Sequence, residues 1–252
     1  MNNVLLREYR PGDLPALKSL WARVFGDPPE LVEDFFRLLP GMGCCFIAEE
    51  GNNVLAMASV ITGFRIMTPG QEPLRCAYLY AVATEEAARN RGLGAAVSRG
   101  AAELGRLAGA KLLCTLPAEQ SLYDWYRDIL SLRHVASRTL CFSDALPERE
   151  SLSPEEYGLR REALLSGTPH AVLDPEAMEF QACLCECFDG GFFSSGKSIF
   201  CAYRDEGVWV IPEWLGPDAA LCSLPGFRTE KRVYLSSDAA LPGGCVWNLS
   251  FD

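Results

Sequence analysis

The sequence has no long apolar run, few histidines and no excess of basic residues. No stretch of the 252 residues approaches the ~18 consecutive apolar residues that a membrane-spanning helix needs. The first nine residues lack a charged region followed by a long apolar stretch, so we expect no secretory signal and a cytoplasmic protein. The only histidines, His134 and His170, lie far apart without a partner motif, which favours structural roles over catalysis.

Acidic residues outnumber basic ones by 33 to 23, which argues against nucleic acid or an anionic membrane as the main partner. The acidity is concentrated in the second part of the chain. Residues 1–146 contain 15 basic and 16 acidic residues, whereas residues 147–252 contain 8 and 17. An acidic surface can attract a cationic substrate, although solubility alone explains the same charge.

Eleven cysteines do not indicate a disulfide scaffold, because their number is odd and 49% of the residues are hydrophobic. We expect reduced thiols that behave as small apolar side chains. Cys183, Cys185 and Cys187 alternate along a predicted helix, and structural zinc normally needs a fourth ligand and wider spacing. The sequence therefore predicts a buried helix face there and no metal site.

The patterning of apolar residues predicts two parts joined by a linker. Residues 1–146 form the first part, residues 147–153 the Ser-, Pro- and Glu-rich linker, and residues 154–252 a smaller α+β part. The expected elements of the first part are a strand at 4–9, helices at 14–24 and 31–38, strands at 44–49, 54–66 and 74–82, a helix from 93, a strand at 111–116, a helix at 119–129 and a strand at 132–142. Those of the second part are helices at 154–165 and 175–188 and strands at 198–204, 207–214 and 231–235.

A turn rich in glycine and arginine connects the strand at 74–82 to the helix that follows. Its sequence is Arg89-Asn90-Arg91-Gly92-Leu93-Gly94-Ala95. Glycines at positions 92 and 94 let the main chain approach a ligand closely, and a helix start carries N–H groups without partners inside the helix. Those donors and the positive end of the helix dipole favour a pyrophosphate, to which Arg89 and Arg91 add cationic charge. We therefore predict an anion-binding turn.

The pattern Arg89-x-x-Gly92-x-Gly94, the strand leading into it and the element order of residues 1–145 resemble the GNAT superfamily of N-acetyltransferases. The resemblance implies an α+β fold in which helices flank a mixed, mostly antiparallel sheet. It implies that the turn at 89–95 binds the pyrophosphate of acetyl-CoA, the cosubstrate, and that Val82 and Ala83 hydrogen-bond its pantetheine arm. It also implies that the strands from 111 and 132 splay apart to leave a slot for the cosubstrate.

The helix at 119–129 resembles the next helix of that family, in which a tyrosine returns a proton to the departing thiolate. This role carries over to Tyr126; the alternative is that Tyr126 is a core aromatic residue. Leu130 and Ser131 stand where the family usually has Gly-Phe. The strand at 74–82 has no interior carboxylate that could act as the general base. Three candidates are left for this role: a water chain, a carboxylate of the second part and the C-terminal carboxylate of Asp252.

Residues 191–198 match the phosphate-loop pattern G-x-x-x-x-G-K-[ST]. That pattern binds nucleotides only when a strand leads into it and a helix follows, whereas here a predicted helix precedes it and a predicted hairpin follows. A nucleotide-binding protein acting through Lys197 is therefore the weakest hypothesis.

The leading hypothesis is an acetyl-CoA-dependent N-acetyltransferase acting on a primary amine of a small molecule or peptide, including a cationic one. The alternative is a non-catalytic CoA-binding or regulatory module with the same fold. The second part can be a degenerate second copy of that fold, as in tandem members of the family. The sequence leaves the acceptor and the oligomeric state open, a homo-oligomer included.

Overall fold

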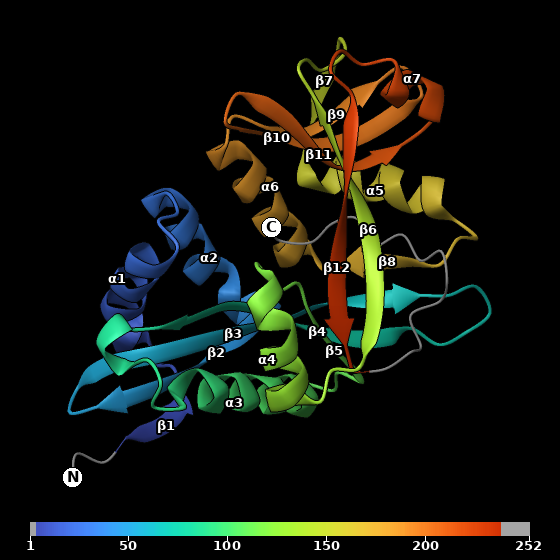
Figure 1. Cartoon of the computed structure of the whole chain (residues 1–252). Helices are drawn as coiled ribbons and strands as arrows, with labels where there is room; N and C mark the ends of the chain where they lie inside the picture. Colours follow the sequence, from blue (N-terminus) through green and yellow to red (C-terminus); the bar gives the residue numbers. More distant parts are fainter. Residues whose placement is uncertain (1–3, 238–252) are drawn as a thin grey trace. The chain divides into compact units, whose positions relative to one another are not determined.

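The computed structural model describes residues 4–237 of the chain (Figure 1). Within that range the chain divides into two compact units. The first unit contains residues 4–65, 74–136 and 234–237, and the second contains residues 66–73 and 137–233. The predicted boundaries, 1–146 and 154–252, differ from these units because the chain returns to the first unit at residue 234, which no local pattern announces.

The first unit is built on a mixed sheet with the strand order β1-β2-β3-β4-β5-β12. Its elements are β1 (Leu5–Glu8), α1 (Leu14–Val24), α2 (Pro29–Met42), β2 (Gly43–Glu50), β3 (Asn53–Met67), β4 (Leu74–Thr84), α3 (Leu93–Leu107), β5 (Leu112–Thr115) and α4 (Gln120–Leu130). The pairs β1–β2, β2–β3 and β5–β12 are antiparallel, and β4–β5 is parallel. This confirms the predicted α+β class and element order.

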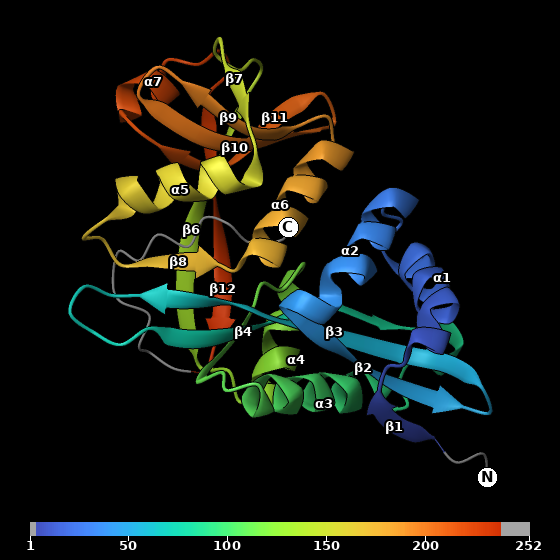
Figure 2. The ribbon, with the colours of Figure 1, turned by 180° about the vertical axis from the view of Figure 1, so that it is seen from behind.

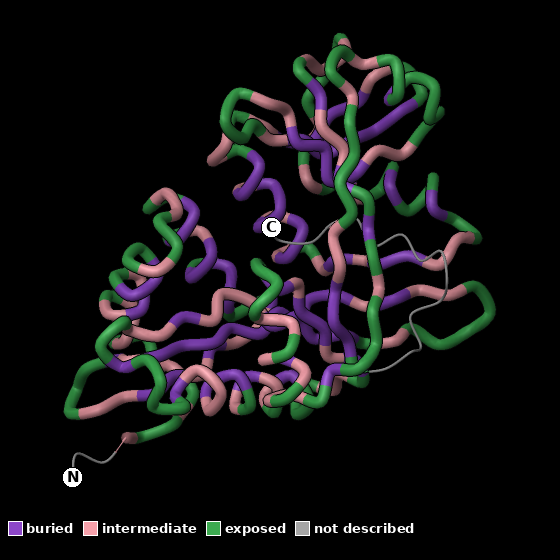
Figure 3. The backbone as a smooth tube through the Cα atoms, in the orientation of Figure 1, coloured by how far each residue is buried: buried purple, intermediate pink, exposed green. Residues whose placement is uncertain are grey.

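Helices cover both faces of this sheet, α1 and α2 on one face and α3 with α4 on the other (Figures 1 and 2). The amphipathic helix α3 buries Val97 and Ala101 in a cluster that also contains Tyr126 of α4. On the opposite face the ring of Trp21 lies 4.8 Å from that of Phe35 and 5.8 Å from that of Tyr80. Buried residues accordingly concentrate on the central strands and on the inward faces of the helices (Figure 3).

The predicted splay between the strands from 111 and 132 is wrong. The free edge of β5 pairs with β12 (Arg228–Ser236), through Leu235 opposite Thr115 and Ser236 opposite Cys114. The strand from 132, which is β6 (His134–Ser143), is separated from β5 by β12 and lies between β12 and β11. Local apolar patterning cannot show that a strand more than 110 residues downstream completes the sheet. The sequence therefore led to the prediction that the strand from 132, the next one along the chain, lies beside β5.

The second unit has a sheet with the order β6-β11-β10-β9-β7. Its further elements are β7 (Glu150–Leu152), α5 (Pro154–Leu165), β8 (His170–Leu173), α6 (Pro175–Cys187), β9 (Gly191–Ser195), β10 (Ser198–Asp205), β11 (Val208–Leu215) and α7 (Asp218–Cys222). The predicted helices and strands are present, whereas β7, β8, β9 and α7 were not predicted. The predicted linker 147–153 contains β7, which pairs with β9.

The segment that matches the phosphate-loop pattern forms a β-hairpin. Strands β9 and β10 pair antiparallel from Ser195 opposite Ser198, so Lys197 lies in a two-residue turn with Gly196 at φ +57°. No helix follows it, and the pattern therefore lacks the context that phosphate binding needs.

The second unit repeats the topology of the first half of the first unit. The pairing order β7-β9-β10-β11 corresponds to β1-β2-β3-β4, and in both cases two helices separate the first strand from the second. After β11, however, the chain enters the five-residue helix α7 through Pro217 and begins it with Asp218. An acidic residue at a helix start does not suit an anion, so the repeat has no second phosphate turn.

Candidate functional site

The turn between β4 and α3 is open and offers unpaired amides. A short 3-10 helix (Glu86–Ala88) leads to Asn90 and Gly92, which have φ values of +61° and +76°. The first hydrogen bond of α3 runs from Ala96 N–H to Gly92 O over 3.0 Å. The N–H groups of Leu93, Gly94 and Ala95 donate to no described atom, and nothing lies within 4 Å of where a Cβ would stand on Gly92. These donors match an anion at the positive end of the helix.

The two arginines of the turn differ in their partners. Arg91 forms a two-pronged ion pair with Glu50 at the end of β2, with Nη2–Oε1 at 2.9 Å and Nη1–Oε2 at 3.2 Å. The hydrogen bond from Arg91 lowers the pKa of Glu50. Arg89 is exposed, and its side chain makes no ion pair with a described residue. Arg89 is therefore available to an anion in the turn, whereas Arg91 fixes the turn to β2.

Gly94 lies where the turn meets α4. A Cβ on Gly94 would stand 3.2 Å from Thr84 Oγ1 and 3.5 Å from the indole of Trp125. The first turn of α3 is therefore closely covered by the end of β4 and by α4. This contact favours the second glycine of the motif, because even a Cβ there would press against Thr84 Oγ1.

Strand β4 leaves β5 near the middle of its length. The parallel pairing covers Cys76, Ala77 and Tyr78 opposite residues 112–114, and β4 then continues to Thr84 while β5 ends at Thr115. Ala81 has a φ of +48°, which bends β4 just before Val82 and Ala83. Val82 is half-buried and Ala83 is buried. The edge of β4 that faces β5 thus loses its partner between Leu79 and the turn at 89–95.

Tyr126 reaches this point of divergence from α4. Its side chain is 7% exposed, and burial raises its pKa to about 12 against the opposing effect of a hydrogen bond with Thr115. Thr115 Oγ1 in turn donates to Leu79 O over 3.1 Å. The phenol is therefore protonated at neutral pH and connects α4 to the place where β4 and β5 separate. Sequence reasoning missed Thr115, which ends a short apolar strand and carries no motif.

The end of α4 accounts for the departure from the family's Gly-Phe. Ser131 adopts φ +56°, the left-handed conformation that usually favours glycine, and Leu132 after it is fully buried. Ser131 ends the helix, as the glycine of Gly-Phe would, and Leu132 packs into the core, as the phenylalanine would. The turn lies five residues after Tyr126 instead of four.

Three further expectations from the sequence concern the chain terminus, metal ligands and membrane-spanning helices. The C-terminal carboxylate of Asp252, one candidate for the general base, lies outside the described residues. Between residues 4 and 237 no group of three or more histidine, cysteine or acidic side chains is arranged to hold a metal ion. None of the helices in that range has the length and apolarity needed to span a membrane.

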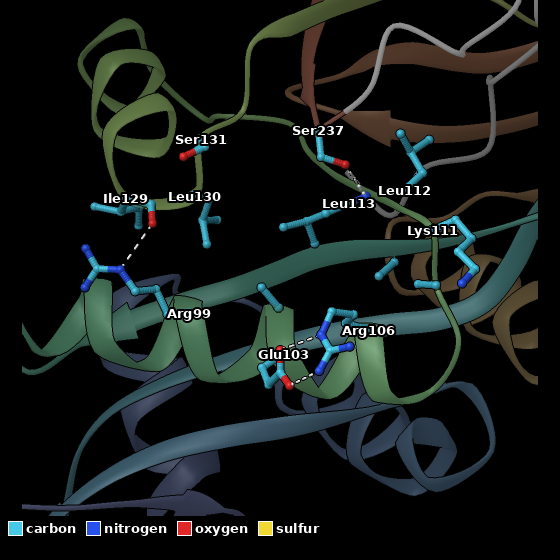
Figure 4. A pocket seen from close by; sticks show the side chains of 13 residues that line it. Arg99, Glu103, Arg106, Lys111, Leu112, Leu113, Ile129, Leu130, Ser131 and Ser237 are labelled. Atoms are coloured by element: carbon cyan, nitrogen blue, oxygen red, sulfur yellow. Dashed lines mark hydrogen bonds and ion pairs between the residues drawn. The ribbon is translucent and has the colours of Figure 1, made fainter.

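A cavity of about 400 Å³ lies at the other end of α3 (Figure 4). Two of the cationic side chains that line it, Arg99 and Arg106, already have partners in the protein. Arg99 Nε donates to Ile129 O at the end of α4 over 3.2 Å, and Arg106 pairs with Glu103. Cations at two helix C-termini compensate the helix dipoles, so this cavity is not a second phosphate site.

The chain matches known acetyltransferases. Residues 6–126 match the family model described as acetyltransferase (GNAT) domain. A comparison with curated proteins gave no significant match.

Solved structures share the fold over nearly the whole chain. A GCN5-related N-acetyltransferase from Kribbella flavida superposes with a TM-score of 0.65 at 14% identity, covering 93% of this chain and 71% of that one. A conserved protein of unknown function from Enterococcus faecalis gives 0.66 at 12% identity, with 94% and 72% covered. A protein from Pyrococcus horikoshii assigned to the acetyltransferases gives 0.62 at 13% identity, with 96% and 91% covered. At these identities the likeness shows the fold alone. Together with the family match, it identifies residues 6–126 as a GNAT acetyltransferase domain.

Proposed function

We propose that this protein transfers an acetyl group from acetyl-CoA to a primary amine, and that it does so in the cytoplasm. The observation that carries the proposal is the open turn whose amides at Leu93, Gly94 and Ala95 have no described acceptor. A pyrophosphate accepts several hydrogen bonds at once and carries the charge that a helix N-terminus favours. Arg89 adds the cationic charge, since Arg91 is paired with Glu50.

The pantetheine arm would follow the edge of β4 that β5 no longer covers. A backbone edge supplies N–H and C=O groups, and the amide groups of pantetheine are suited to pair with them as a short strand would. Val82 and Ala83 lie on this edge, between the phosphate turn and Leu79. An arm along them would bring the thioester toward Thr115 and Tyr126.

Tyr126 would act on the sulfur as the C–S bond breaks. An ordinary thiol has a pKa of about 8.5, well below the value of about 12 for this phenol, so complete proton transfer from the phenol to the thiolate is uphill. A hydrogen bond from the phenol to the developing thiolate needs no such transfer and strengthens as charge builds on the sulfur. We therefore assign Tyr126 the role of hydrogen-bond donor to the leaving group.

The acceptor remains a primary amine of a small molecule or peptide. The acidic charge of residues 147–252 favours a cationic one. We also propose that the second part, predicted at residues 154–252, is a degenerate second copy of the fold. The topology of the second unit from β7 to β11 repeats that of the first half of the first unit, after which the chain enters α7 with Asp218.

Isothermal titration is expected to show one CoA bound per chain with micromolar or tighter affinity, because only the first unit has the phosphate turn. Absence of heat at millimolar CoA would remove the proposal, and two equal sites would contradict the assignment of the second unit. A panel of polyamines, aminoglycosides and amino acids, read by release of free CoA from acetyl-CoA, then tests turnover.

A CoA-binding module without turnover is the second candidate. The observation in its favour is that β4 carries no carboxylate along its length, so no base on that strand takes the proton of the attacking amine. CoA binding without acetylation of any amine in the panel would favour this module, and a single acetylated product would exclude it.

Replacing Tyr126 by phenylalanine is expected to slow acetyl transfer about 10- to 100-fold and to leave the Kd of CoA unchanged, because only the hydrogen bond to the sulfur is lost. Steady-state kinetics and titration measure the two quantities. Tyr123→Phe, three residues earlier on α4, is the matched control. Equal turnover in Tyr126→Phe and the parent would show that Tyr126 contributes only to packing.

A further inference from the structure

The second unit contains two thiols in close contact on different elements. Sγ of Cys185 on α6 lies 3.2 Å from Sγ of Cys201 on β10, and both residues are fully buried. A disulfide bond is about 2.05 Å long, so the two sulfur atoms are roughly 1.2 Å from bonding distance. A rotation of either side chain within its packing covers a distance of that size.

The polar group next to the Cys185–Cys201 pair is oriented to donate a hydrogen bond to sulfur and not to accept one from a thiol. Gln181 is fully buried one turn before Cys185 on α6, and its Nε2 points at Cys185 Sγ over 3.8 Å. Its Oε1, which would accept a proton from a thiol, has no partner. An amide that presents its N–H₂ group to sulfur suits a disulfide, which accepts hydrogen bonds and donates none.

The same surroundings make the thiols slow to react while the unit is closed. Burial, the neighbouring Cys185 and the charge of Glu213, which stands opposite Cys201 in the β10–β11 register, all raise the pKa of Cys201. The thiolate is the reactive species, so oxidation requires a brief local opening of α6.

We propose that Cys185 and Cys201 form a reversible disulfide that fastens α6 to strand β10. The two thiols lose two protons and two electrons as the S–S bond forms. A hydroperoxide accepts them and yields an alcohol and water, and the azo compound diamide accepts them and yields its hydrazine. A dithiol reverses the reaction by thiol–disulfide exchange. The proposal is independent of the transferase activity, because the pair lies in the second unit and belongs to no site described above.

Tryptic cleavage of the native protein after oxidation provides a direct test. The folded chain is treated with diamide, its remaining thiols are alkylated under denaturing conditions, and it is digested without reductant. Cleavage gives a peptide of residues 162–197, which contains Cys183, Cys185 and Cys187, and a peptide of residues 198–204, which contains Cys201. The expected product is these two peptides linked, two hydrogen masses below their sum, and lost after treatment with dithiothreitol.

Neighbouring cysteines of α6 supply matched controls. Cys185→Ala and Cys201→Ala are expected to abolish the linked peptide, whereas Cys183→Ala and Cys187→Ala retain it. A link that persists in Cys185→Ala overturns the proposal. So does the absence of any link under conditions that fully oxidise the exposed Cys222. If a variant does not fold, fragmentation of the wild-type linked peptide between positions 183, 185 and 187 identifies the bonded sulfur.

The thermal midpoint gives an independent readout. Because the bond closes a loop between residues 16 positions apart, the oxidised protein is expected to unfold roughly 5–10 °C above the reduced one. The shift should disappear in Cys185→Ala and remain in Cys187→Ala. If the disulfide forms but the thermal midpoint of the oxidised protein is unchanged or lower, the bond does not fit the native geometry and the proposal is wrong.

Discussion

Replacing Gly94 by valine is expected to abolish CoA binding at concentrations at which the parent protein is saturated. A Cβ at this position would stand 3.2 Å from Thr84 Oγ1 and 3.5 Å from the indole of Trp125. The two methyl groups of valine have nowhere to go except toward the ligand side of the turn. They would also displace the first turn of α3, whose amides at Leu93 to Ala95 are proposed to hold the pyrophosphate.

Titration with CoA measures the loss, and circular dichroism with a thermal scan shows whether the variant is folded. Gly158→Ala is the matched control, because Gly158 lies on α5 in the second unit and a Cβ there makes only an ordinary contact with Met178 at 3.9 Å. We expect the control to bind CoA as the parent does. A folded Gly94→Val protein that binds CoA within threefold of the parent would show that the pyrophosphate lies elsewhere.

The second large effect concerns stability. Replacing Glu213 by glutamine is expected to lower the free energy of unfolding by about 3–5 kcal/mol, the usual cost of removing one partner of a buried ion pair. Glu213 is 1% exposed, and it accepts from Tyr157 Oη over 2.7 Å and from Arg161 Nε over 2.9 Å. The amide would leave the fully buried guanidinium of Arg161 with only the half-exposed Glu162 as a counter-charge.

Urea unfolding measures the change, which amounts to about a fifth or more of a typical stability of 5–15 kcal/mol. Glu162→Gln, which removes the 43%-exposed partner of the same arginine, is the matched control and should cost less than about 1 kcal/mol. The double variant Arg161→Met, Glu213→Leu should recover most of the loss, because it removes both buried charges. Equal stabilities of Glu213→Gln and Glu162→Gln would contradict the role of the buried Arg161–Glu213 ion pair in stability.

The open turn before α3 was predictable because its determinants are local. Glycines at 92 and 94 and the amphipathic pattern of the following helix define the turn within a few residues, and hydrogen bonds at a helix start depend on the backbone alone. The role of Arg91 was not predictable, since its partner Glu50 lies 41 residues away on β2. A charge next to a turn in sequence can equally well bind a ligand or a neighbouring strand.

Tyr126 illustrates a mixed case. Its place on α4 followed from helical periodicity and from the family resemblance. Its protonation state did not, because burial in the folded unit raises the pKa of Tyr126 to about 12, against the lowering effect of a hydrogen bond with Thr115 of β5. Likewise, Ser131 gave no glycine signal, and only the backbone shows that it adopts the left-handed conformation that closes the helix.

The sequence by itself determined the order of helices and strands in the first part, the open glycine turn before α3 and the rejection of the phosphate-loop match, because periodicity, glycine spacing and helix starts act over neighbouring residues. Only the tertiary structure decided that β12 returns to pair with β5, that β4 and β5 diverge after Tyr78, and that Cys185 meets Cys201. These features join residues far apart along the chain. Which strands pair and which side chains meet depends on the total burial that the whole fold achieves, and no local pattern contains that information.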